Sequence, residues 1–87
     1  NDNMRGGDGT DTLVGGAGDD IVHGDGGNDR ILGHSGKDYL YGDAGDDNMQ
    51  GNRGEDTMWG GIGNDSMHGN EDYDLIRGEV GDDVGLA

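Results

Sequence analysis

Residues 15–23 read GGAGDDIVH, and this nine-residue pattern recurs along the whole chain. In each unit a Gly-rich stretch of six residues ends in Asp, and three residues with an apolar middle side chain follow. A shift of nine residues aligns one column of aspartates without exception. That column contains Asp2, Asp11, Asp20, Asp29, Asp38, Asp47, Asp56, Asp65, Asp74 and Asp83. The chain is therefore a repeat array, in which the acidic residues are placed at fixed positions.

Two more columns share this register. Glycine precedes the aspartate by two residues at Gly9, Gly18, Gly27, Gly36, Gly45, Gly54, Gly63 and Gly81, and Asp72 is the exception. The apolar column, two residues after the aspartate, contains Met4, Leu13, Val22, Ile31, Leu40, Met49, Met58, Met67 and Ile76 and fails at Gly85. We interpret the chain as a single array, with nine full units at 6–86 and a partial unit at 1–5. We expect it to be an excerpt of a longer chain.

The three residues after each aspartate alternate polar, apolar, polar, which predicts a short strand with one inward side chain. Two units would then form one coil of about 18 residues, and stacked coils would give two parallel sheets that face each other. The glycines permit the positive φ angles of sharp turns, and their spacing excludes helices. In this arrangement His23, Tyr41 and Trp59 would stack in one outward ladder.

The composition shows why such an array needs help to fold. The 87 residues include 22 Gly and no Phe, and only 28% are hydrophobic, so a conventional core is excluded. There is no Cys for a disulfide and no apolar run long enough to span a membrane. The net charge of −15 makes nucleic acid and anionic membranes poor partners. A chain this acidic would be disordered unless a cation neutralises it.

The stretch 15–23 resembles the calcium-binding nonapeptide of repeat-in-toxin (RTX) proteins, and the resemblance covers nearly the whole chain. It implies a right-handed parallel β-roll, a β-solenoid in which calcium is held between successive turns. It also implies secretion from a Gram-negative bacterium, to the medium or the cell surface.

Stacked coils would bring together aspartates that are two units apart, which would form two ladders. Carboxylates about 4.8 Å apart repel unless a cation lies between them. Calcium suits such sites because it takes six to eight oxygens and Gly-rich turns offer backbone carbonyls. We predict that the metal sites are formed by the ten aspartates of the column and by seven of the glycines that precede them by two residues. These glycines are Gly9, Gly18, Gly27, Gly36, Gly45, Gly54 and Gly63. Each ladder of five aspartates has four gaps, so the array would hold about eight ions.

Other functions fit less well. No window supplies the acidic spacing of an EF-hand, and no catalytic constellation is present, so we expect no enzyme activity. His23, His34 and His68 fall in different columns or on different sides, which argues against a zinc cluster. The aromatic face with Tyr41 and Trp59 either protects the sheet or contacts a glycan or a second copy.

Two functions remain. One is a calcium-dependent folding and secretion module of a larger extracellular protein, in contact with neighbouring repeats or domains of that protein. The other is a structural repeat of an extracellular filament, adhesin or surface layer.

Overall fold

The described residues, 3–69, 75–77 and 84–86 of the computed structural model, form ten strands of three residues each and no helix. The strands are β1 (Asn3–Arg5), β2 (Thr12–Val14), β3 (Ile21–His23), β4 (Arg30–Leu32), β5 (Tyr39–Tyr41), β6 (Asn48–Gln50), β7 (Thr57–Trp59), β8 (Ser66–His68), β9 (Leu75–Arg77) and β10 (Val84–Leu86). Every strand lies where the nonapeptide columns predict one. Along the described ranges, no helix has the length and apolar character needed to cross a membrane.

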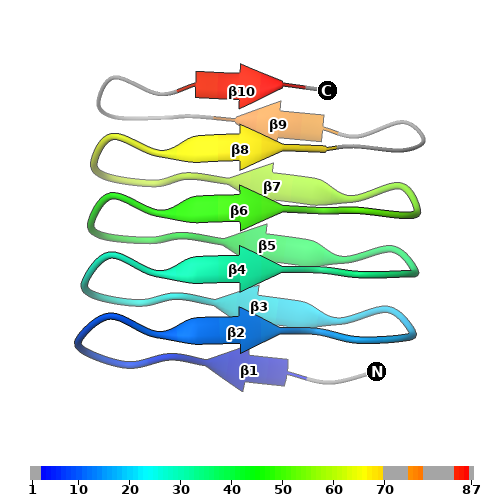
Figure 1. Cartoon of the computed structure of the whole chain (residues 1–87), viewed down its shortest axis with the longest axis horizontal. Helices are drawn as coiled ribbons and strands as arrows, with labels where there is room; N and C mark the ends of the chain where they lie inside the picture. The colour runs from blue at the N-terminus through cyan, green and yellow to red at the C-terminus, as the bar shows by residue number, and fades with distance from the viewer. Residues whose placement is uncertain (1–2, 70–74, 78–83, 87) are drawn as a thin grey trace.

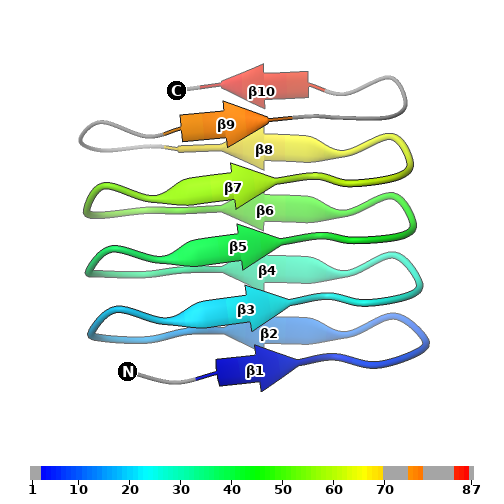
Figure 2. The same ribbon diagram turned by 180° about the vertical axis from the view of Figure 1, so that it is seen from behind.

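The strands alternate between two parallel sheets, which lie one in front of the other (Figures 1 and 2). One sheet has the order β1-β3-β5-β7-β9, and the other has the order β10-β8-β6-β4-β2. Residues paired across neighbouring strands are two repeat units apart, as in Ile21 opposite Tyr39 and Arg30 opposite Asn48. The chain is thus an all-β solenoid with 18 residues per coil, the separation that joins Asp20 to Asp38. This confirms the fold class predicted from the repeat.

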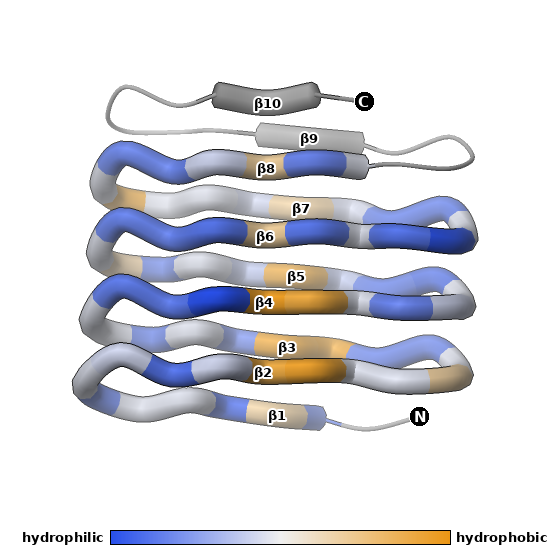
Figure 3. The backbone as a smooth tube through the Cα atoms, viewed as in Figure 1, coloured by the Kyte–Doolittle hydropathy of each residue, from blue (hydrophilic) through white to orange (hydrophobic). Residues whose placement is uncertain are grey.

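The core is a single layer between the sheets. The middle side chains of β3 to β8 are at most 1% exposed, and they are Val22, Ile31, Leu40, Met49, Met58 and Met67. Met4 and Leu13 pack against them and are partly buried. The Cα atoms span 13 Å along the shortest axis, which leaves room for only this one layer. Figure 3 shows hydrophobic residues concentrated in the strands, whereas hydrophilic residues predominate in the turns.

The turns depend on two left-handed positions in each unit. The second turn residue has a φ of 67° to 69° in Asp25, His34, Asp43 and Asn52, residue types that tolerate this region better than others. The fourth turn residue is glycine in every described turn. A methyl group on Gly27 would collide with the carbonyl oxygen of Gly9 in the adjacent coil. Close stacking of the coils therefore requires glycine there.

The outward ladder of aromatic rings predicted on the first sheet is confirmed. The rings of His23 and Tyr41 stack with centroids 4.4 Å apart and planes within 6°, and those of Tyr41 and Trp59 stack at 4.5 Å and 4°. These residues are the last of β3, β5 and β7, and each is half-buried. The coil register alone therefore brings side chains from successive coils into van der Waals contact.

Candidate metal centre

Aspartates 18 residues apart meet at both edges of the solenoid, as the sequence predicts. In five described aspartates of the ladders, the backbone N–H donates a hydrogen bond to Oδ1 of the aspartate one coil further along. The distances are 2.9 Å from Asp11 to Asp29, 2.9 Å from Asp20 to Asp38, 2.8 Å from Asp29 to Asp47, 2.9 Å from Asp38 to Asp56 and 2.8 Å from Asp47 to Asp65. One carboxylate oxygen of each acceptor therefore ties its coil to the preceding one.

The second carboxylate oxygen has a different environment. In Asp11, Asp29 and Asp47 on one edge, and in Asp38 on the other, Oδ2 is buried and accepts no hydrogen bond. Both Asp29 and Asp47 are at most 3% exposed as whole residues. Burying an anionic oxygen without a partner is unfavourable in free energy, so a positive charge next to these atoms would stabilise the fold.

Each such oxygen faces a gap next to the first glycine of its turn. A methyl group placed on Gly24 would lie 2.7 Å from Asp29 Oδ2 and 2.9 Å from the carbonyl oxygen of Gly42, one coil along. At Gly33 the corresponding distances are 2.6 Å to Asp38 Oδ2 and 2.9 Å to Gly51 O. A carboxylate oxygen and a backbone carbonyl oxygen thus converge on one small space that is too tight even for a methyl group. This is the oxygen-rich environment that calcium prefers.

Burial and mutual repulsion disturb the ionisation of these groups. Burial raises the pKa of Asp47 to about 7, and repulsion from the carboxylates of Asp65, Asp29 and Asp43 adds to the effect. Burial likewise raises the pKa of Asp38 to about 6, with repulsion from Asp20 and Asp19. The pKa of Asp29 is raised for the same reason. Without a cation, the fold therefore disfavours the ionised form of Asp47 and, less strongly, that of Asp38.

The donor set fits a hard divalent cation. The ladders offer carboxylate and carbonyl oxygens and no nitrogen or sulfur, which suits calcium and not a transition metal. When bound, such an ion would supply the positive charge that the Oδ2 atoms lack. The described ladder members are Asp11, Asp20, Asp29, Asp38, Asp47, Asp56 and Asp65. Asp2, Asp74 and Asp83, also predicted ligands, lie outside the described residues.

The glycines divide into two groups. The carbonyl oxygens of Gly24, Gly33, Gly42, Gly51 and Gly60, each the first residue of a turn, lie beside the gaps described above. Sequence reasoning did not single out these carbonyls as ligands. It assigned Gly9, Gly18, Gly27, Gly36, Gly45, Gly54 and Gly63, the fourth residues of the turns, and that assignment stays a prediction.

A second ladder of hydrogen bonds, on the exposed outside of the turns, was also missed. Here the side chain of the fifth turn residue accepts a bond from the backbone of the next coil. The pairs are Lys37 N to Asp19 Oδ1, Asp46 N to Asn28 Oδ1, and Asn64 N to Asp46 Oδ1, each 2.8 Å long. The signal in the sequence is the frequent Asp or Asn directly before the ladder aspartate. These bonds join neighbouring coils on the outside of the turns, whereas the following residue of each unit belongs to the aspartate ladder.

The comparisons with known proteins agree with this geometry. The family of the RTX calcium-binding nonapeptide repeat matches in four overlapping copies, at residues 1–31, 23–58, 32–67 and 59–85. No curated protein and no solved structure matches the chain. The family match covers nearly all of the sequence, and its nine-residue period is the one that builds both carboxylate ladders. The chain therefore belongs to the RTX calcium-binding nonapeptide repeat family.

Proposed function

We propose that this chain is a module that binds calcium along both edges and folds when it does so, outside the cell, within a larger extracellular protein. The observation that carries the proposal is the buried Oδ2 of the ladder aspartates, for example in Asp29 and Asp47, beside a backbone carbonyl oxygen. We assign the metal sites to the aspartate ladders and the Gly-rich turns between them.

Binding and folding would be coupled because the rest of the structure is weak. The core is one side chain thick, and 22 glycines must be ordered. The net charge of −15 opposes compaction, and about eight calcium ions would nearly cancel it. Metal binding would then supply much of the free energy of folding.

The calcium threshold connects this behaviour to secretion. Sites with few carboxylates and many carbonyls on a flexible frame resemble extracellular modules, whose dissociation constants are about 10⁻⁴ to 10⁻³ M. Such sites would be empty at cytosolic calcium, and the repelling chain would stay extended for export. Calcium outside the cell would then fold it and stabilise the parent protein. We assign no catalytic role to the module.

The test follows folding by circular dichroism and binding by isothermal titration calorimetry. In chelator the chain should be unfolded, calcium should produce β signal cooperatively, and magnesium should substitute poorly because it demands a smaller octahedral site. A chain that is fully folded in chelator would refute coupled folding. Half-saturation below about 1 µM would mean that the array folds before export, which would leave only a structural role.

A further inference from the structure

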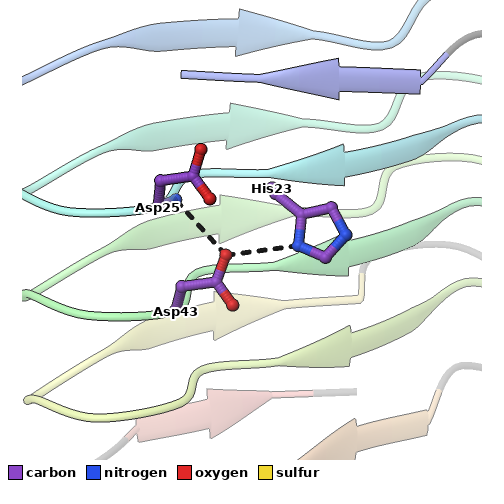
Figure 4. A group of neighbouring side chains, drawn as sticks. All are labelled: His23, Asp25 and Asp43. Atoms are coloured by element: carbon purple, nitrogen blue, oxygen red, sulfur yellow. Dashed lines mark hydrogen bonds and ion pairs between the residues drawn. The ribbon is translucent and has the colours of Figure 1, made fainter. Parts of the chain in front are cut away.

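A second group of potential metal ligands lies outside the aspartate ladders, at the end of β3 and in two neighbouring turns (Figure 4). It consists of His23, the last residue of β3, with Asp25 and Asp43. Each side chain offers one ligand atom, and these atoms all lie within 4.8 Å of one another. His23 Nδ1 is 3.2 Å from Asp43 Oδ2, to which the backbone N–H of Asp25 also donates a bond of 3.3 Å.

The fold explains this proximity. Asp25 and Asp43 are both the second residue of their turns and are 18 residues apart, so the coil repeat places them next to each other. Two like charges at this distance repel. Arg5 places a cation beside them, with its Nη1 3.0 Å from Asp25 Oδ1. The Arg5 side chain is 65% exposed, so it can move aside at little cost.

The imidazole is held in position before any ligand arrives. Its ring lies parallel to the ring of Tyr41, which in turn stacks on Trp59, and this fixes the plane of His23. Nδ1 points at Asp43, so the nitrogen and the carboxylate oxygens face one another from two coils (Figure 4). A ligand set that is already ordered loses less conformational entropy on binding metal.

The chemistry of this group differs from that of the ladders. One imidazole nitrogen and two carboxylate oxygens are a donor set that zinc accepts, whereas calcium prefers oxygen alone. The three side chains are half-buried, so water can complete a tetrahedral coordination sphere. We propose that His23, Asp25 and Asp43 form a zinc site on the outside of the solenoid, separate from the calcium ladders. The separation of the three histidines in the sequence argues against a cluster of histidines, whereas this site uses one histidine and two aspartates.

The simpler alternative is an ion pair. His23 and Asp43 are 20 residues apart, as are Arg5 and Asp25, so a protonated His23 could repeat the contact made by Arg5 one coil earlier. A zinc site and an ion pair make opposite demands on the imidazole, because zinc needs the neutral ring and the ion pair needs the protonated one. Measurements at a pH where an ordinary imidazole is neutral therefore separate the two.

The experiment is a zinc titration of the whole chain at about pH 7.5 in excess calcium, which keeps the array folded and the ladders filled. We expect one zinc equivalent to bind and to shift the imidazole resonances of His23, but not those of His34 or His68, in NMR spectra. His23→Gln should weaken zinc binding by at least about tenfold because a ligand is lost. His68→Gln is the matched control, since His68 ends β8 on the other sheet, and it should bind zinc like the unaltered chain.

Asp25→Asn provides a second variant in which His23 and its stacking on Tyr41 stay intact. It too should weaken zinc binding, while its calcium-dependent circular dichroism should match that of the unaltered chain. If zinc binds His23→Gln and Asp25→Asn as tightly as the unaltered chain, or if the His23 resonances do not respond, the group is an ion pair only and the proposal is wrong. Because calcium is saturating throughout, neither result bears on the calcium sites.

Discussion

The backbone N–H of Asp29 donates a 2.8 Å hydrogen bond to Oδ1 of Asp47, one coil further along, while Asp47 Oδ2 is buried without such a bond. The two oxygens of this carboxylate therefore have different environments. The first oxygen aligns neighbouring coils, and the second faces the gap beside Gly42. Because the two functions belong to different atoms, substitutions can separate them.

Asp47→Asn should therefore impair calcium binding more than coil stacking. The introduced amide keeps an oxygen for the Asp29 N–H but loses the charge, so we expect the calcium midpoint to rise at least about tenfold, or about 1.4 kcal/mol. Asp46→Asn is the matched control, because it removes the same charge one residue earlier and keeps the acceptor for Asn64. Calorimetric titrations compare the two. Equal midpoints would contradict the assignment of the metal sites to the ladders.

The metal-free chain should gain structure as the pH falls. The ordinary aspartate pKa of 3.8 is raised in the fold to about 7 for Asp47 and about 6 for Asp38. Folding therefore favours the protonated groups, and their contribution to stability is complete below about pH 4 and lost as the pH rises towards about 7. Circular dichroism of the calcium-free chain should show more β signal at about pH 5 than at about pH 7.5. A signal that is equal or larger at the higher pH would refute this.

Filling the gap beside a ladder aspartate should also weaken calcium binding. In Gly24→Ala the new methyl group would lie 2.7 Å from Asp29 Oδ2 and 2.9 Å from Gly42 O. We therefore expect the free energy of calcium-dependent folding to become less favourable by about 1–3 kcal/mol. Gly26→Ala in the same turn is the control, because its methyl group would meet only the movable side chain of Asp8, at 3.1 Å. Calcium-dependent folding curves of the two variants test the difference. A smaller effect in Gly24→Ala than in Gly26→Ala would argue against an oxygen-lined gap.

The apolar column should add to the stability that calcium gives the folded state. Met49 is fully buried, and Met49→Ala should lower the free energy of unfolding by about 2–5 kcal/mol. The preceding residue, Asn48, is exposed, and Asn48→Ala should change the free energy of unfolding by no more than about 0.5 kcal/mol. Urea unfolding in excess calcium measures both. Similar losses in the two variants would show that the thin core is not what holds the sheets together.

The sequence predicted most of this fold because its period determines both the strands and their register. A spacing of two units specifies which strands pair, as for Ile21 and Tyr39, and which rings stack, as for Tyr41 and Trp59. It also places Asp29 beside Asp47. No long-range contact had to be inferred separately, which is unusual outside repeat proteins.

The details of the turns could not be predicted in the same way. Which oxygen of Asp47 accepts the hydrogen bond, and which is buried without one, depends on the side-chain rotamer. The position of a residue in a repeat column does not specify that rotamer. The approach of His23 to Asp43 spans 20 residues, and so it links two different columns across adjacent coils. A comparison at the repeat period alone does not reveal such diagonal contacts.

The two periods of the molecule have a consequence for how its length can change. The aspartate and apolar columns recur in every unit, whereas each face repeats with every second unit, because successive units lie in opposite sheets. Deleting residues 42–50 should preserve both ladders but move Trp59 to the other face, away from Tyr41, and near-ultraviolet circular dichroism would register the loss of their stacking. Deleting a whole coil of 18 residues would instead keep every remaining side chain on its original face. The array can therefore change length by single units without breaking its aspartate ladders, but only whole coils can be added or removed without changing which side chains share a face.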